Sequence, residues 1–326
     1  MKHISILVPH MAILGSVEGP RMLFTEVNEF LKSMDKPALF DVHLVGLSRD
    51  TVLNKGACTL HTDLVIQDVK RTDLVIIPAV QGDLGQAVEM NREFIPWITT
   101  QYKEGAEVAS LCMGAFILAA TGLVKQKKCA THWMAANEFR KMFPDVNLVA
   151  DKILTDEQGI YSSGGAFSYL NLILYLIEKY AGRSVAVLCS KIFQIDLDRG
   201  SQSPFIMFKG QKDHDDEPVK HAQDFIEKNY QEKITVDQLA SMLSIGRRNF
   251  ERRFKKATSN TVVEYIQRVK IEVAKMNLES SRDNVNEVMY KVGYSDNKAF
   301  RTIFSRITGL SPLQYRNKYN RDMVVQ

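Results

Sequence analysis

The sequence is poor in cysteine and has no long apolar run, and both shortages exclude whole classes of protein. Its 326 residues hold four cysteines, Cys58, Cys112, Cys129 and Cys189, with no Cys-x-x-Cys pair among them. This scatter argues against a disulfide scaffold or a zinc site, so we expect free thiols, no metal and no cofactor. No stretch approaches the roughly 20 apolar residues of a membrane helix, and the first apolar run is too short for a signal peptide. We therefore expect a cytoplasmic protein with no membrane partner.

Acidic residues are scarce in the last third of the chain. Residues 1–217 hold 22 Lys and Arg against 26 Asp and Glu, a net charge of −4, whereas residues 218–326 hold 20 against 12, a net charge of +8. Positive charge gathered in the smaller C-terminal part is typical of proteins that bind polyanions. A merely solvated basic surface has the same composition, so only the motifs can distinguish a polyanion-binding domain from a solvated one.

A polar, charged segment that ends at Pro218 predicts the domain organisation: a first domain at 1–208, a linker at 209–218 and a second domain at 219–320. Buried-strand patterns at 4–8, 41–47, 73–78 and 107–111 alternate with helical patterns in the first domain. This alternation predicts an α/β, flavodoxin-like parallel sheet covered by helices on both faces. The second domain reads as all-α.

Two stretches of the second domain, 239–256 and 288–306, repeat one pattern. Each has an amphipathic helix, a turn with glycine and a second helix with two phenylalanines four residues apart, Phe250 and Phe254 in the first and Phe300 and Phe304 in the second. The pattern predicts helix-turn-helix motifs at about 235–257 and 285–307, which present their second helices to the DNA major groove.

The outer faces of the two second helices carry side chains suited to DNA. Arginine can bond guanine with two donors, asparagine can bond adenine, and lysine contacts phosphate. The candidate DNA-contacting residues are Arg247, Arg248, Glu251, Arg252 and Lys255 in the first motif and Asn297, Lys298, Arg301 and Thr302 in the second. Among the basic residues of these helices, we expect four to face phosphate or solvent: Arg253, Lys255, Lys256 and Arg306. The best candidates for base contacts are Arg248, Arg252, Asn297, Lys298 and Arg301.

A connecting helix is expected at 262–279, and its length decides how far apart the two second helices lie. At 1.5 Å per residue it spans roughly 27 Å, which suits two reading helices about one DNA turn apart. Its predicted apolar spine consists of Tyr265, Ile266, Val269, Val273 and Met276.

A strand, a sharp turn and a helix are predicted around Cys112 in the first domain. A thiol at that turn lies near a helix N-terminus, where the dipole and free N–H groups favour the thiolate. The layout is the cysteine version of a nucleophile elbow. His132, twenty residues on, is expected to approach the same pocket, with a purely structural role beside Trp133 as the alternative.

Motifs in both domains resemble known families. In the first domain these are Glu18-Gly19-Pro20, Cys112-x-Gly114-Ala115-Phe116, Thr131-His132-Trp133, Tyr161-Ser162-Ser163-Gly164-Gly165 and Arg199-Gly200-Ser201-Gln202. They are similar to the ThiJ/PfpI superfamily, the class I glutamine amidotransferase-like fold. Gly293-Tyr294-Ser295-Asp296 and Thr308-Gly309-Leu310-Ser311-Pro312 resemble the AraC/XylS family, although the first motif has Thr258-Ser259-Asn260 where Thr-Gly is usual. The whole chain resembles the GlxA-like regulators.

The resemblance implies a nucleophilic Cys112, a nearby His132 and a carboxylate that falls on Glu18, which otherwise simply caps or solvates its loop. Hydrolytic members often have histidine directly after the cysteine, and Met113 in that place argues against peptidase or amidase chemistry.

We interpret the chain as a transcriptional regulator that binds a double-stranded DNA operator and is controlled by a small-molecule effector near Cys112, acting as a homodimer. RNA polymerase is a further candidate partner. The alternatives are a cysteine-dependent hydrolase, lyase or amidase, a redox sensor that uses Cys112, and a DNA-architectural protein without effector.

Overall fold

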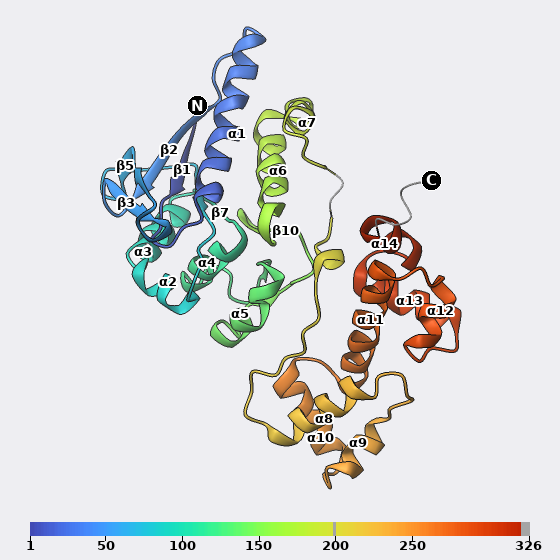
Figure 1. Cartoon of the computed structure of the whole chain (residues 1–326). Helices are drawn as coiled ribbons and strands as arrows, with labels where there is room; N and C mark the ends of the chain where they lie inside the picture. Colours follow the sequence, from blue (N-terminus) through green and yellow to red (C-terminus); the bar gives the residue numbers. More distant parts are fainter. Residues whose placement is uncertain (198–199, 321–326) are drawn as a thin grey trace. The chain divides into compact units, whose positions relative to one another are not determined.

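The computed structural model describes residues 1–197 and 200–320, and the chain divides into two compact units, Met1–Gln202 and Ser203–Gln326 (Figure 1). The second unit therefore begins before the linker expected at 209–218. Within that unit the ring of Phe208 lies 5.1 Å from the ring of Tyr265, and Lys212 pairs with Asp224 and Glu227 at 2.8 Å. Charged residues of this segment therefore hold it against α8 (Glu217–Lys228) through ion pairs.

The first unit is built on a seven-stranded sheet with the strand order β10-β11-β7-β6-β1-β2-β5. The four predicted strands are confirmed to within about two residues: β1 (Lys2–Leu7), β2 (Phe40–Gly46), β6 (Leu74–Ile77) and β7 (Glu107–Ser110). These strands, β5 (Leu64–Val65) and β11 (Ile160–Ser163) are parallel, whereas β10 (Leu154–Glu157) is an antiparallel edge. Two small two-stranded sheets, β3 (Asp50–Leu53) with β4 (Cys58–His61) and β8 (Lys128–Cys129) with β9 (Asn147–Leu148), complete the strands of the described residues.

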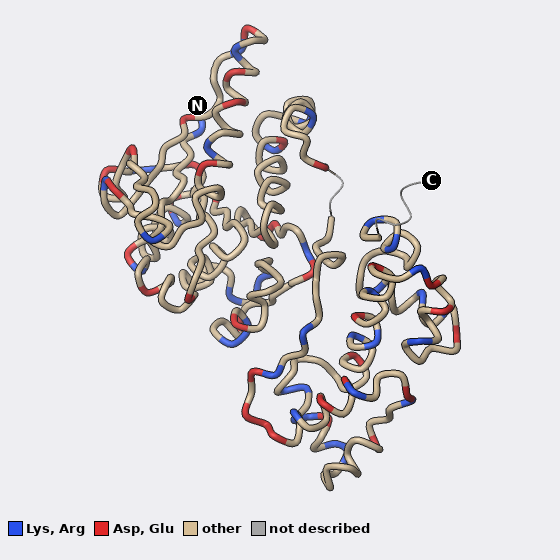
Figure 2. The backbone as a smooth tube through the Cα atoms, in the orientation of Figure 1, with Lys and Arg blue, Asp and Glu red and all other residues tan. Residues whose placement is uncertain are grey.

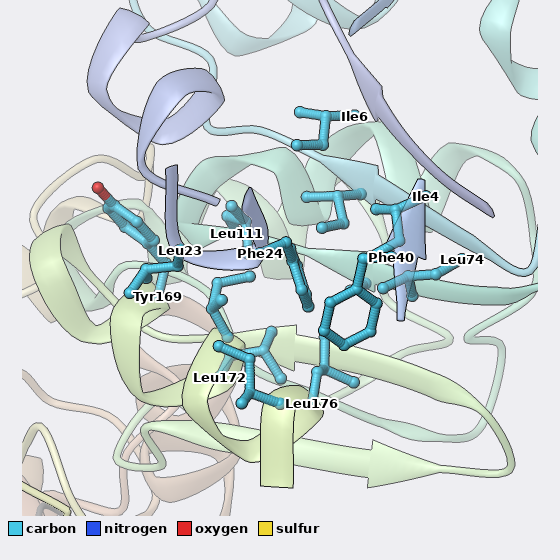
Figure 3. Close-up of a cluster of buried hydrophobic side chains, with 14 of the residues drawn as sticks. Ile4, Ile6, Leu23, Phe24, Phe40, Leu74, Leu111, Tyr169, Leu172 and Leu176 are labelled. Carbon is cyan, nitrogen blue, oxygen red and sulfur yellow. The ribbon is translucent and has the colours of Figure 1, made fainter. Parts of the chain in front are cut away.

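Helices cover both faces of the sheet, as the alternating pattern predicts. One face carries α1 (Leu14–Ser33), α6 (Tyr169–Ala181) and α7 (Arg183–Ile192), and the other α2 (Leu84–Met90), α3 (Phe94–Lys103), α4 (Ala115–Ala120) and α5 (Ala136–Met142). Successive residues of β1 point to opposite faces, so Ile6 lies in the first core and Leu7 in the second. Figure 3 shows Phe24 of α1, Phe40 of β2 and Leu172 of α6 converging in the first core.

The second unit is helical: α8, α9 (Val236–Met242), α10 (Arg247–Thr258), α11 (Val262–Ser280), α12 (Val285–Lys291), α13 (Asn297–Thr308) and α14 (Pro312–Tyr319). It has two cores, one around Phe250 and Phe254 and one around Phe300 and Phe304, all fully buried as predicted. The long helix α11 contributes to both cores. The structure thus confirms two helix-turn-helix motifs joined by one helix.

The predicted apolar spine of α11 is wrong at Met276, which is 51% exposed. The helix serves two cores in succession, so its buried stripe passes from Tyr265 in the first core to Ile271 and Leu278 in the second. Met276 continues the first stripe beyond the end of the first core, so it is left on the outside.

The ends of α10 and α13 repeat one local structure. The hydroxyl of Thr258 donates to the carbonyl of Phe254 at 2.8 Å, and the hydroxyl of Thr308 donates to that of Phe304 at 2.9 Å. The next residue is left-handed in both motifs, with φ of 56° at Ser259 and 73° at Gly309. The unusual serine therefore keeps the turn, at the steric cost that a side chain meets in this conformation.

Candidate DNA interface and thiol site

The first helix-turn-helix exposes one face of α10. The hydroxyl of Thr235 accepts the N–H of Gln238 at 3.1 Å, and this capping box fixes where α9 begins. Because Phe250 and Phe254 turn the opposite side of α10 into the core, Arg248, Arg252 and Lys255 are exposed, and Arg247 and Glu251 share that outer surface.

The exposed side chains of α10 differ in how they are held. Arg247 pairs with Asp237 at 2.9 Å and with Glu251 at 3.5 Å. Arg252 donates from Nη2 to Oδ1 of Asn249 at 2.9 Å. Arg248 has no ion pair within the residues that the structure describes. The ion pairs orient Arg247 but offset its charge, whereas Arg248 and Arg252 keep their full charge at the surface.

The second motif holds its candidate residues in a small hydrogen-bond network. Oδ1 of Asn297 accepts from Nε of Arg301 at 2.5 Å, and Nδ2 of Asn297 donates to Oδ1 of Asn286 on α12 at 2.5 Å. Lys298, Arg301 and Thr302 are exposed, while Asn297 is half-buried. The start of α13 is fixed by Asp296, whose carboxylate accepts the N–H of Lys298 at 2.8 Å.

Arg253 is held within the fold, which differs from the expected contact with phosphate or solvent. Its Nε and Nη2 lie 2.9 and 2.7 Å from the two carboxylate oxygens of Asp216. Asp216 belongs to the acidic run before α8, visible as a red stretch in Figure 2, and it caps α8 through the N–H of Val219. The hydrogen bonds from Arg253 lower the pKa of Asp216. Arg306 is also engaged, with Oε1 of Gln267 at 2.6 Å.

Cys112 lies at the predicted strand–turn–helix junction, between β7 and α4. Its φ of 53° is left-handed, a strained conformation for a residue with a side chain. The turn is clamped on both sides, because the N–H of Cys112 donates to Oγ of Ser163 at 3.2 Å and Thr131 donates to the carbonyl of Cys112 at 3.0 Å. Gly114 is required there, since an added Cβ would lie 2.4 Å from the carbonyl oxygen of Pro78.

The structure does not favour the expected thiolate at Cys112. The residue is only 3% exposed, and burial raises the pKa of its thiol, while backbone hydrogen bonds from Ala166 and Met113 lower the pKa by less. The helix that follows has six residues, so the dipole effect is outweighed by the loss of solvent. The direction of this shift favours the protonated thiol over the thiolate.

His132 reaches the loop that covers Cys112, and its ring is held in place. An added Cβ on Gly165 would lie 2.5 Å from this ring, and the next residue, Ala166, hydrogen-bonds the thiol. Nδ1 of His132 accepts the N–H of Met134 at 3.1 Å, and the imidazole ring lies 5.6 Å from the ring of Trp133. Burial lowers the pKa of His132. These contacts agree with the structural alternative for this histidine.

Glu18 lies on α1, where both of its carboxylate oxygens accept from Arg21 at 2.6 Å. This bidentate pair occupies the carboxylate, so the contact with the thiol that the resemblance implies gains no support.

Gln202 belongs to a motif that the sequence analysis singled out, but the sequence did not reveal its positioning role. Its Oε1 accepts the N–H of Gly165 at 3.0 Å, and its Nε2 donates to the carbonyl of Thr131 at 3.0 Å. The side chain, which is 2% exposed, thus ties together the two loops around the thiol. Arg199 of the same motif lies outside the described residues.

A second feature of the first unit is a cavity of about 690 Å³ at the amino-terminal ends of β1 and β2, the sheet edge opposite to Cys112. Asp41 lines it and accepts from His3 at 2.9 Å and from His43 at 3.0 Å. Burial favours a higher pKa for Asp41, but the two histidines lower it. Across the described ranges, no group of three or more His, Cys, Asp and Glu could hold a metal ion, and no helix is long and apolar enough to cross a membrane.

Comparison with known proteins identifies both units. The sequence model of the DJ-1/PfpI family matches residues 21–179, and that of a helix-turn-helix domain matches residues 239–318. The first unit is a DJ-1/PfpI domain, and the second is an AraC-type helix-turn-helix domain.

Relatives share the order of the two domains. The HTH-type transcriptional regulator GbdR of Pseudomonas aeruginosa is 23% identical over 85% of this chain and 75% of its own length. The HTH-type transcriptional regulator CdhR of the same species is 21% identical over 95% of this chain and 90% of its own. A ThiJ/PfpI family protein from Pseudomonas syringae, 16% identical, matches 60% of this chain and 75% of its own with a TM-score of 0.50, which supports the fold of the DJ-1/PfpI domain.

Proposed function

We propose that this chain is a transcriptional regulator whose AraC-type domain reads double-stranded DNA with α10 and α13 together. The observation that carries the proposal is the pair of helix-turn-helix motifs on a single helix, α11, each with its phenylalanines buried and its basic face exposed. Two such helices can enter successive major-groove segments on one side of a duplex.

The proposed readers divide by chemistry. Arg248 and Arg252 on α10 and Asn297 and Arg301 on α13 have the donors and acceptors that distinguish bases in the major groove. We assign phosphate or sugar contacts to Lys255, Lys298 and Thr302, and an orienting role to Arg247 and Glu251, which pair with each other.

Selection of duplexes from a random-sequence library by the full-length protein tests this proposal. We expect enrichment of a site that binds at least about a thousandfold more tightly than random competitor DNA, the lower end of the range for specific regulators. Binding of all duplexes with equal affinity would overturn sequence-specific regulation.

We propose further that the DJ-1/PfpI domain binds a small-molecule effector at the turn around Cys112 and does not turn it over. Open α/β sheets bind ligands at the carboxyl ends of their strands, where this turn lies. The raised pKa of the buried thiol, the engaged His132 and the paired Glu18 all weigh against nucleophilic catalysis. The effector would act by favouring one arrangement of the regulator over another.

Glutamine and methylglyoxal are suitable probes for the rival enzyme hypothesis, because they represent amide and α-oxoaldehyde substrates. We expect no turnover of either by the wild-type protein. Turnover that disappears in Cys112→Ala would contradict the proposal and favour a cysteine-dependent hydrolase, lyase or amidase.

Three further assignments follow from regulation of DNA. We propose a homodimer, since paired half-sites match a two-fold protein. RNA polymerase is the proposed partner for activation. The proposed location is the cytoplasm, on the nucleoid, because a regulator acts where the chromosome is.

A further inference from the structure

Lys270 is a buried cation in the middle of α11. It is the ninth of 19 helical residues and is 7% exposed. Its ammonium donates to the carbonyl oxygens of Glu232 and Gly293, each at 3.2 Å, and lies 5.4 Å from the ring centre of Tyr294. No carboxylate pairs with it among the residues that the structure describes. Burying the charge of a lysine costs free energy of folding. Because two backbone carbonyls of distant segments accept from this one ammonium, the contact points to a structural role for Lys270.

The two carbonyls belong to the two halves of the helical unit, one before the first helix-turn-helix motif and one inside the second. Glu232 precedes α9 of the first motif, and Gly293 is in the turn between α12 and α13 of the second. The two segments touch directly: Gly293 has φ of 75°, and an added Cβ there would lie 2.0 Å from the carbonyl oxygen of Gln231. Tyr230, just before, packs against both cores. We call Lys270 with the Glu232 and Gly293 carbonyls the Lys270 clasp.

A second buried lysine on the same helix makes a different set of contacts. Lys275 is 3% exposed, and its ammonium donates to Oε2 of Glu272 at 2.8 Å and to the carbonyl of Ile206 at 2.6 Å. These contacts hold the first segment of the second unit, around Ile206, and link neither motif to the other. Lys275 is therefore a matched control, alike in residue type, helix and burial.

We propose that Lys270 is a positioning residue that fixes the setting of α10 relative to α13, so that the protein accepts its two DNA sub-sites at one spacing. The proposal rests on the DNA-reading function proposed above. Apolar contacts alone let each motif tilt on its side of α11, whereas two directional hydrogen bonds at mid-helix restrain that tilt. One added base pair turns the second sub-site by roughly 34° and shifts it by roughly 3.4 Å, which a rigid pair of helices cannot follow.

The test uses the full-length protein and three duplexes. The first is the duplex that the wild-type protein selects from a random library. The other two have one base pair inserted or deleted between the two sub-sites that the protein contacts. We expect the wild-type protein and Lys275→Met to bind the altered duplexes about tenfold more weakly or worse, the order of one lost base contact. We expect Lys270→Met to bind the original duplex more weakly and to discriminate among the three by less than about threefold.

Methionine matches the lysine side chain as far as Cε, lacks the ammonium and can contact the Tyr294 ring, so the domain should remain folded. Lys270→Gln, which is shorter and neutral, provides a second variant with the same expected loss of discrimination. Wild-type discrimination in either folded variant would overturn the clasp while leaving the DNA-reading function intact. A wild-type protein that selects no duplex at all would overturn both.

Discussion

Arg252 and Arg253 are neighbours in the sequence with different surroundings, and this difference gives the most specific prediction. Arg252 is exposed on α10, and Arg253 is bound to Asp216. We expect Arg252→Ala to weaken binding of the selected duplex and to relax the preference at one base pair. We expect Arg253→Ala to leave base preference unchanged and to lower the melting temperature, because it removes the partner of the residue that caps α8.

The magnitude for Arg252 follows from its geometry. A bidentate arginine–guanine contact is worth about 1–3 kcal/mol of discrimination, or about 5- to 140-fold in the dissociation constant. The hydrogen bond that Arg252 gives up to Asn249 is exposed and contributes little. The net effect should therefore be close to that of the base contact alone.

Titration of each variant against the selected duplex and its single-base substitutions measures this effect. A uniform loss across all duplexes would reassign Arg252 to phosphate. A change of base preference in Arg253→Ala would refute the division between the two arginines.

The remaining predictions concern charge, packing and the thiol. Affinity should fall with salt with a logarithmic slope of about −4 to −5, if four to six basic side chains of α10 and α13 displace counterions; a flat profile would count against DNA binding through these helices. Leu278→Ala should lower the free energy of unfolding by about 2–5 kcal/mol, whereas Met276→Ala should change it by about 0.5 kcal/mol at most, and equal effects would contradict the two-core account of α11. Ser259→Gly should raise the melting temperature by relieving a left-handed serine, and a lower value would show that the serine is not strained. Because burial raises the pKa of the Cys112 thiol, iodoacetamide should label Cys112 more slowly than the partly exposed Cys58 at pH 7, with labelling of Cys112 accelerating only above the usual thiol range; rapid labelling of Cys112 at neutral pH would restore the thiolate.

The sequence predicts those parts of the fold whose signals are local and repeated. Apolar runs mark β1, β2, β6 and β7, and phenylalanines four residues apart mark both second helices of the motifs. It does not predict β10 and β11, because these short strands bury a polar pair, Thr155 bonded to Ser162 at 2.6 Å, where an apolar run would be needed to recognise them.

Features of the site that depend on residues far apart in the sequence cannot be predicted from sequence patterns. In the sequence, nothing distinguishes Arg253 from the other basic residues of its helix. In the folded chain it contacts Asp216, which lies 37 positions earlier. Lys270 meets Glu232 and Gly293, which lie 38 positions before it and 23 after it. No periodic pattern relates residues so far apart, so only the folded chain reveals these contacts. The thiolate expectation for Cys112 gains no support for a related reason, because the burial of this residue is a property of the whole turn.

The central claim is that two helices joined by α11 read one duplex together. Methylation interference on the selected duplex, which reports protein contacts to guanine in the major groove, tests it most directly with the full-length protein. The predicted result is interference at two segments on one face of the duplex, about one helical turn apart. A single segment, or interference spread evenly along the duplex, would contradict the claim.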